Sequence, residues 1–341
     1  MRKVLTVVLI ALVVASLSTQ GILAAKKEKG KTDSNEVVFS TVVKDNGHLQ
    51  VKNGQLCNEK GEPIQLKGMS THGLQFCNFG KNTLKYLVRD WKITVIRAVL
   101  YTGQNGYIGH PELKERLTAI VDQAIRYGIY VVIDWHVIEE RDPNIYKNEA
   151  KVFFEEMATT YGKYPNVIYE ICNEPNSGKT IDVTWQGQIK PYAETVIPAI
   201  RAIAPNNIII VGTDTWSQGV DRAADDPLNY PNIMYTLHFY AGTHKQWLRD
   251  KADYALSKGA ALFVTEWGTT NSNGAGRLYL DEAQTWLDWM KQHKISWCNW
   301  NFSNYFDDTA ALNTTVGMNG PWKDSQLTES GEWIKSKLLE K

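Results

Sequence analysis

The chain has 341 residues, with 37 basic and 37 acidic side chains, so its formal net charge is zero. This balance excludes a strongly basic face of the kind that binds nucleic acid or an anionic membrane surface. The length is sufficient for one large core, and the sequence shows neither a second domain nor an internal repeat.

The N-terminus has the layout of a secretory signal peptide. Residues 1–3 form a short basic head, residues 4–14 are almost wholly apolar, and small residues end at Ala25 before Lys26. We therefore predict a leader over residues 1–25, a polar linker over 26–40 and one domain over 41–341. An uncleaved anchor is the alternative, because the cleavage site lacks a small-x-small pattern. After cleavage we expect a secreted protein without membrane contact.

The rest of the chain alternates between strand and helix patterns. A hairpin is predicted over 49–57, with its turn at Lys52-Asn53-Gly54. Apolar runs then predict strands at 64–70, 94–100, 130–134, 167–171, 208–211, 233–237, 261–266 and 295–300. Helical periodicity lies between them at 84–91, 111–127, 149–161, 188–203, 246–257 and 278–293, and closes the chain at 332–339. The gap between the fifth and sixth strands holds only residues 221–226, so the helix there is predicted to be short or irregular. Eight strands that alternate with helices predict a parallel sheet closed as a (β/α)8 barrel.

Two of these strands end in a glutamate. Glu174 follows Asn173 after the run at 167–171, and Pro175 then stops any sheet pairing. Glu266 ends the run at 261–266 and precedes Trp267 and Gly268. Two carboxyl groups delivered to the same end of a barrel are what glycoside hydrolysis requires: one protonates the leaving oxygen, and the other attacks or activates water.

Other polar and aromatic side chains are predicted at the same barrel end. The full set is His72, Arg97, Tyr101, His136, Asn173, Glu174, His238, Tyr240, Glu266 and Trp300. Because a buried cation is costly without a partner, Arg97 is expected to pair with a carboxylate at the mouth and to keep it ionised. Among the twelve tryptophans, four near strand ends or in loops are predicted to stack on sugar rings: Trp216, Trp267, Trp300 and Trp322.

The four cysteines do not have the spacing of a zinc ribbon or a redox pair. Cys172 and Cys298 lie in apolar runs and are predicted to be small buried hydrophobes, whereas the sequence leaves a Cys57–Cys77 disulfide open. Two acidic pairs, at 225–226 and 307–308, are interpreted as turn or cap residues. We predict neither a metal site nor a cofactor.

Together these motifs resemble glycoside hydrolase family 5. The resemblance rests on Asn173-Glu174-Pro175, Glu266-Trp267-Gly268, Arg97, His136, His238 with Tyr240, and Trp300. The segment 67–75, Lys-Gly-Met-Ser-Thr-His-Gly-Leu-Gln, is similar to that of its bacterial endoglucanase (cellulase) subfamily. The resemblance extends from Gly47 to the end of the chain.

The resemblance implies a retaining endo-β-1,4-glucanase that acts on cellulose without a metal or organic cofactor. Glu174 would be the general acid/base and Glu266 the nucleophile. Asn173 would bond the sugar 2-hydroxyl, while Arg97 and Tyr240 would bond Glu266. The remaining roles would be subsite contacts: His136 and His238 at the cleavage subsite, Trp300 as its stacking floor, and His72 with Tyr101 on the non-reducing side. A monomer is the default expectation.

Two positions depart from that subfamily, and three other readings stay open. Phe76 replaces a usual tryptophan, and Tyr305 replaces a lysine. The same machinery could cut mannan, xyloglucan or mixed-linkage glucan. A barrel that binds polysaccharide without cutting it would have lost one of the two glutamates. A metabolic barrel could use the stretch 273–276, Asn-Gly-Ala-Gly, as a phosphate loop, although a flexible turn fits it better.

Overall fold

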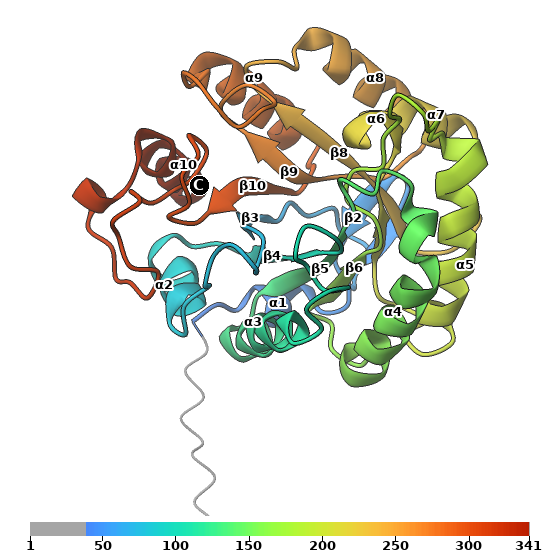
Figure 1. Ribbon diagram of the computed structural model, residues 1–341, viewed down its shortest axis with the longest axis horizontal. Coiled ribbons are helices and arrows are strands. Elements are labelled where there is room, and N and C mark those ends of the chain that lie inside the picture. Colours follow the sequence, from blue (N-terminus) through green and yellow to red (C-terminus); the bar gives the residue numbers. More distant parts are fainter. Residues whose placement is uncertain (1–38, 341) are drawn as a thin grey trace, which may run out of the picture. The chain divides into compact units, whose positions relative to one another are not determined.

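The computed structural model describes residues 39–340, and the predicted leader therefore lies outside the described residues. Eight parallel strands close into a barrel in the order β10-β3-β4-β5-β6-β7-β8-β9, with helices packed around it (Figure 1). A separate pair of antiparallel strands, β1 and β2, precedes the barrel in the chain. The predicted hairpin and (β/α)8 barrel are confirmed.

The strands and helices keep close to their predicted ranges. The strands are β1 Gln50–Lys52, β2 Gln55–Cys57, β3 Lys67–Thr71, β4 Val95–Tyr101, β5 Tyr130–His136, β6 Val167–Glu170, β7 Ile209–Val211, β8 Ile233–Tyr240, β9 Leu262–Gly268 and β10 Trp297–Phe302. The α-helices are α1 Val42–Asn46, α2 Thr83–Asp90, α3 Leu113–Tyr127, α4 Lys147–Tyr161, α5 Lys190–Arg201, α6 Asp214–Ser217, α7 Val220–Asp225, α8 Gln246–Ser257, α9 Leu280–Gln292 and α10 Glu329–Leu339. Shorter helical turns are η1 Pro143–Tyr146, η2 Trp185–Ile189 and η3 Asp324–Gln326.

Strand β4 shows how the sequence separates the inside of the barrel from the outside. Its side chains alternate between the two faces, as in any strand. Ile96, Ala98 and Leu100 belong to the large apolar layer shared with the helices. Val95 belongs to a second cluster inside the barrel, and Arg97 lies two positions further along the same face. An arginine at an inward position can be tolerated only where carboxylates meet it.

The interior cluster is closed by the hairpin. Leu49 and Leu56 pack in the same apolar cluster as Val95 and Tyr130, which begin their strands. The hairpin therefore covers the amino-terminal end of the barrel, where the chemistry of such folds is not found. The carboxyl ends of the strands remain free to carry the polar residues.

Strand β9 contains a bulge immediately before Glu266. Thr236 of β8 pairs with Phe263, but His238 pairs with Glu266, so β9 uses three residues where β8 uses two. The pairing with β10 shifts over the same stretch, between Val264 and Trp267. A bulge re-aims side chains near functional sites. Here it lets the consecutive residues Thr265 and Glu266 both face polar partners inside the barrel.

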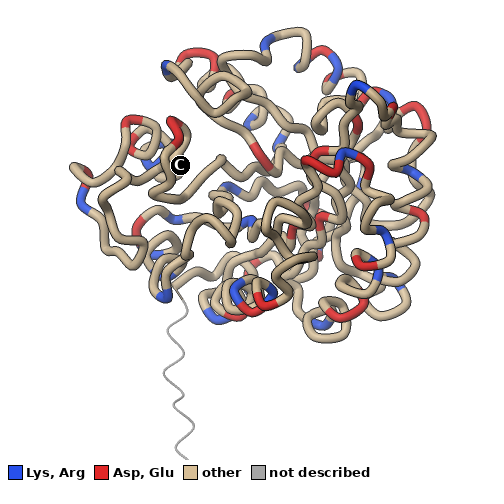
Figure 2. Tube along the Cα trace, viewed as in Figure 1, with Lys and Arg blue, Asp and Glu red and all other residues tan. Residues whose placement is uncertain are grey.

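Several further predictions can be compared with the described residues. All four cysteines are free and buried, which confirms the interpretation of Cys172 and Cys298 and shows no bond between Cys57 and Cys77. Phe39 and Ser40, placed in the linker by sequence, contact Tyr127 of α3. Within residues 39–340, no helix combines the length and apolar character needed to cross a membrane. Figure 2 shows basic and acidic positions interspersed over the helices in that view, as the balanced composition predicts.

Candidate active site

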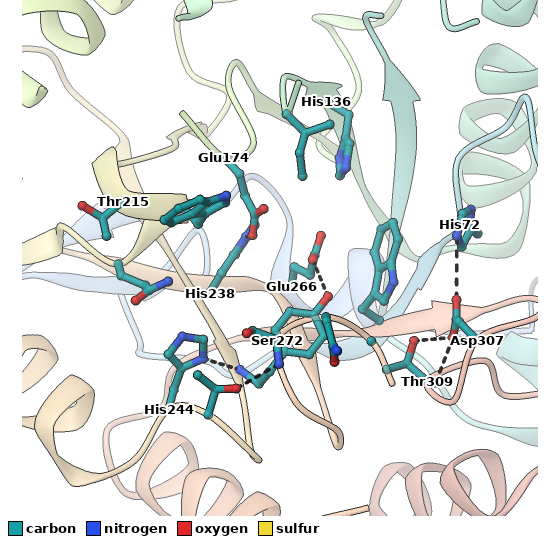
Figure 3. Close-up of a pocket in the computed structure, with 18 of the residues that line it drawn as sticks. His72, His136, Glu174, Thr215, His238, His244, Glu266, Ser272, Asp307 and Thr309 are labelled. Atoms are coloured by element: carbon teal, nitrogen blue, oxygen red, sulfur yellow. Dashed lines mark hydrogen bonds and ion pairs between the residues drawn. The ribbon is translucent and has the colours of Figure 1, made fainter. Parts of the chain in front are cut away.

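A cleft of about 740 Å³ opens at the carboxyl ends of the barrel strands. Eight of the ten predicted site residues line it: His72, Tyr101, His136, Glu174, His238, Tyr240, Glu266 and Trp300. The other two, Arg97 and Asn173, are fully buried and bond to residues of that lining. The structure thus brings all ten together. Figure 3 labels five of them: His72, His136, Glu174, His238 and Glu266.

Arg97 is the centre of a buried charge network. Its Nε donates to Glu170 at 2.7 Å, its Nη1 to Glu266 at 2.9 Å, and its Nη2 lies 3.0 Å from Asp134. Burial alone would lower the pKa of this guanidinium, but the three carboxylates raise it well above its usual range. The sequence predicted one carboxylate partner at the mouth, and the structure places three around the cation.

Glu266 receives two strong donors. Arg97 Nη1 bonds Oε2 at 2.9 Å, and the Tyr240 hydroxyl donates to Oε1 at 2.8 Å. Both oxygens are therefore held, so the carboxylate plane has a fixed orientation at the cleft floor. Charge-assisted bonds of this kind stabilise negative charge on the carboxylate.

Glu174 has a different environment. It lies past the end of β6, and its backbone N–H donates to Val137 at 3.1 Å. Among residues 39–340, its side chain has no lysine or arginine within hydrogen-bond reach, and its partner is His238. Burial raises the pKa of this carboxyl to about 8, against a smaller opposing effect of Arg97. Glu174 is therefore protonated at neutral pH, as a general acid must be.

His238 holds that proton on Glu174 through its tautomer. The Thr265 hydroxyl donates its only proton to Glu170 at 2.6 Å, so it must accept from His238 Nε2, which lies 2.8 Å away. Burial lowers the pKa of His238 to about 4, and the ring is neutral near pH 7. Its Nδ1 then carries a lone pair, which accepts the Glu174 proton over 2.8 Å.

Asn173 and His136 are fixed by the same network. Arg97 Nη2 donates to Asn173 Oδ1 at 2.6 Å, and Asn173 Nδ2 donates to Val137 at 3.2 Å. His136 Nδ1 lies 2.6 Å from Asp134. Burial lowers the pKa of His136 well below its usual value and raises that of Asp134 to about 7. The amide therefore has one orientation relative to the cleft, which suits a group that must recognise one sugar hydroxyl.

The two glutamates are close together. One oxygen of Glu174, one of Glu266 and one ring nitrogen of His238 all lie within 4.8 Å of one another. This is the one group of three in residues 39–340 with the spacing of metal ligands. Its chemistry does not suit a cation, because Arg97 already bonds Glu266 and Glu174 carries a proton.

The aromatic predictions are partly wrong. Trp300 and Trp216 line the cleft. Trp267, however, is fully buried and stacks on Phe239, because the bulge turns its side chain towards the helices. Trp322 packs on Phe302 and Tyr86, away from the cleft lining. Neither of these two indoles can stack on a sugar.

Trp216 is held in an unusual backbone. Thr215, Trp216 and Ser217 have φ of 56°, 53° and 57°, so three consecutive residues adopt the left-handed conformation. The strain is supported by backbone bonds, including Trp216 N–H to Pro175 at 3.2 Å. Strained non-glycine backbone persists where surrounding structure enforces it, often at binding sites. Here it directs a 43 % exposed indole to the cleft next to Glu174.

The two departures noted in the sequence lie against each other. The rings of Phe76 and Tyr305 are 5.9 Å apart, and both contact His72, at 5.6 Å and 4.5 Å. Asp307, interpreted from sequence as a turn residue, accepts from the Thr309 N–H at 2.8 Å and also lies 3.8 Å from His72. Of these side chains, His72, Tyr305, Asp307 and Thr309 line one end of the cleft, whereas Phe76 packs behind His72 and Tyr305 outside the lining; Figure 3 labels His72, Asp307 and Thr309.

Sequence reasoning missed Asp134, Glu170 and Thr265, whose side chains orient the predicted residues. One signal was present: Asp134 and Glu170 are charges inside otherwise apolar strands, as Arg97 is. It also missed His244 and Trp247, which line the cleft from the segment after β8 and from α8. No local pattern distinguishes these from other helix and loop residues.

The stretch 273–276 does not form a phosphate loop. The Gly276 N–H donates to the Asp308 carboxylate at 2.7 Å, and the Gly274 N–H donates to Asn271 at 2.9 Å. A carboxylate already occupies the position that an anion would need. Positive φ values of 73° at Gly274 and 95° at Gly276 are those of a glycine turn.

Comparisons with known proteins agree with this geometry. The sequence model of the family Cellulase (glycosyl hydrolase family 5) matches residues 57–306. The chain is 56% identical over 295 residues to an endoglucanase of Clostridium saccharobutylicum, covering 86% of this chain. It is 54% identical over 284 residues to endoglucanase A of Evansella cellulosilytica, covering 82% of this chain. The chain spans 65% and 57% of the length of these two relatives.

Solved structures give the same result. The catalytic domain of endoglucanase Cel5A from Thermobifida fusca is 39% identical and superposes with a TM-score of 0.84, covering 88% of this chain and 100% of that one. A glutamate-to-glutamine variant of that domain, solved in complex with cellotetraose, superposes equally well.

Proposed function

The chain belongs to the cellulase family, glycosyl hydrolase family 5, and from this premise we propose that it is a retaining endo-β-1,4-glucanase acting on cellulose and related β-glucans. The observation that carries the proposal is the pair Glu174 and Glu266, with oxygens within 4.8 Å of each other in one cleft. Retaining glycosidases have carboxyl groups about 5–5.5 Å apart, whereas inverting ones leave about 6.5–9.5 Å for a water. The short separation supports the retaining mechanism.

The proposed reaction has two steps. Glu174 gives its proton to the glycosidic oxygen while a Glu266 oxygen attacks the anomeric carbon, so the bond to the leaving sugar breaks and an ester to the enzyme forms. Glu174, now ionised, takes a proton from water, and the resulting hydroxide attacks the anomeric carbon and releases Glu266. Asn173, positioned by Arg97, would bond the 2-hydroxyl of the sugar at that carbon.

The pH dependence of kcat/KM should report the ionisation of the proposed general acid, Glu174. Because only protonated Glu174 can act in the first step, and burial raises its pKa to about 8, this group should not limit kcat/KM below that pH, where any loss in acid would report protonation of the nucleophile instead. Above it, kcat/KM should fall about tenfold per pH unit. The measurement is kcat/KM on a soluble β-glucan across the alkaline range. A profile that stays flat to about pH 10 would rule out Glu174 as the acid.

The substrate class can be tested by initial rates. We expect hydrolysis of carboxymethyl-cellulose and barley β-glucan at least about tenfold faster than that of mannan or xyloglucan, since a single axial hydroxyl or branch disturbs a fitted cleft. A preference for mannan or xyloglucan would leave the proposed roles of Glu174 and Glu266 unchanged but would contradict cellulose as the substrate. Absence of any hydrolysis by folded protein would favour the non-catalytic binding barrel instead.

Export from the cell is also a proposal. It is supported by the leader-like sequence of residues 1–25. A β-glucan polymer is too large to enter a cell intact, so an enzyme that cuts it internally must meet it outside.

A further inference from the structure

Two exposed indoles lie on the cleft. Of the twelve tryptophans in the sequence, all of which lie within residues 39–340, only Trp216 and Trp247 rank as exposed, at 43 % and 45 %. Both line the same cleft. Large apolar side chains are usually covered in a soluble protein, and exposed ones that share a groove mark a binding surface.

The two glutamates lie between two distinct ends of the cleft. Figure 3 shows Glu174 and Glu266 between His72 on one side and His244 on the other. The ring of Trp247 lies 5.8 Å from that of His244, so Trp247 belongs to the end opposite His72. The resemblance to glycoside hydrolase family 5 implies that His72 lies on the non-reducing side, and we take this direction as part of the proposed function. The His244 end therefore receives the leaving part of the glucan chain.

Trp247 stands on rigid support. It is the second residue of α8, and its neighbour His244 is fixed on both sides. His244 Nδ1 accepts from the Tyr240 N–H at 2.8 Å, and its carbonyl accepts from Trp286 Nε1 at 3.1 Å. Tyr240 in turn bonds Glu266. The indole therefore packs on a histidine that is itself anchored to Tyr240, the residue whose hydroxyl bonds Glu266.

Trp216 is connected more directly to the reacting groups than Trp247 is. The Trp216 backbone bonds Pro175, the residue after Glu174, whereas Trp247 is reached through His244. Polar side chains that could bond sugar hydroxyls line the same region, among them Gln218, Thr243 and Ser272. An aromatic face with polar groups around it matches glucose, whose ring faces are C–H and whose rim is hydroxyl.

We propose that Trp247 is a second sugar-stacking platform on the leaving-group side, binding glucosyl units beyond those that meet Trp216. This rests on the proposed function and deepens it. The ligand is a β-1,4-linked glucan chain of sufficient length to extend past the cleavage point towards α8. An enzyme with this platform gains rate on long chains and gains nothing on substrates with a short leaving group.

The test compares two substrates in three variants. Trp247→Ala should lose about tenfold in kcat/KM on cellohexaose, as expected for one lost stacking contact, and stay within about twofold of the parent on p-nitrophenyl cellobioside, whose leaving group is too short to reach it. Trp247→Phe should recover most of the loss. Tyr254→Ala is the matched control: Tyr254 lies on the same helix, is 41 % exposed and is not part of the cleft lining.

Each outcome is decisive. Equal losses on both substrates would indicate a structural defect and overturn the platform. No loss on either would leave Trp247 as an exposed surface residue only. If the parent protein cuts neither substrate, the proposed function itself fails. Calorimetric binding of cellohexaose to the Glu266→Gln protein, with and without Trp247→Ala, distinguishes failure of the proposed function from failure of the Trp247 platform. Weaker binding in the Trp247→Ala protein would support the platform even if the parent showed no hydrolysis, and equal binding would contradict it.

Discussion

Replacing Glu266 with glutamine should reduce turnover of β-glucan by at least about 10⁴-fold, since the proposed nucleophile is lost and the amide cannot form the covalent intermediate. The side chain keeps its size, and one oxygen can still accept from Tyr240. The other terminal atom would become an N–H group facing Arg97, which costs some stability without removing the cleft. Assays on soluble β-glucan would measure turnover, and calorimetry would measure oligosaccharide binding.

A matched control for this variant is Glu282→Gln. Glu282 is also a partly buried carboxylate bonded to an arginine, Arg249 at 2.6 Å, but it lies outside the cleft lining. The control should keep parental turnover. If Glu266→Gln retained turnover within about tenfold of the parent while folded, Glu266 could not be the nucleophile.

Replacing Arg97 with methionine should have the largest effect on stability. The change leaves Glu170, Asp134 and Glu266 without their shared cation in a site where the arginine and the first two are fully buried. Removing one partner of a buried ion pair costs about 3–5 kcal/mol, because the remaining charge is uncompensated. The free energy of unfolding in urea would measure this loss.

The same variant should also lose activity, because Arg97 positions both Glu266 and Asn173. Arg249→Met is the control. Arg249 is nearly buried and paired with one carboxylate, Glu282, but it lies outside the cleft lining, so its replacement should cost less stability and keep parental kcat. Adding Glu170→Gln to Arg97→Met should restore part of the stability by removing one stranded charge. Stability of Arg97→Met equal to the parent would contradict a charge network that depends on this cation.

The sequence predicted the barrel and the gathering of the ten candidate residues at its mouth, because both depend on local patterns. Apolar runs at regular spacing define the strands, and polar residues at the ends of parallel strands must meet at one mouth. That rule alone was enough to predict that Glu174 and Glu266 lie at the mouth. Predicting the pairing of Arg97 required a second rule, that a buried cation has a carboxylate partner.

The remaining site residues depend on register and could not be predicted in that way. Asp134 and Glu170 lie side by side because they are paired in the register between β5 and β6, and this register cannot be predicted from local sequence patterns. Thr265 faces Glu170 because of the extra residue in β9, and the same bulge sends Trp267 to the helices rather than the cleft. Trp247 lies within an ordinary helical pattern. Its position on the cleft follows from how α8 meets the barrel end.

The central claim is that Glu174 and Glu266 act as a retaining pair, and the anomeric configuration of the first product tests it most directly. Proton NMR of cello-oligosaccharide hydrolysis, recorded before mutarotation, should show the β-anomer forming first, because two displacements at the anomeric carbon restore its original configuration. Initial formation of the α-anomer would mean a single displacement by water, and would contradict Glu266 as nucleophile.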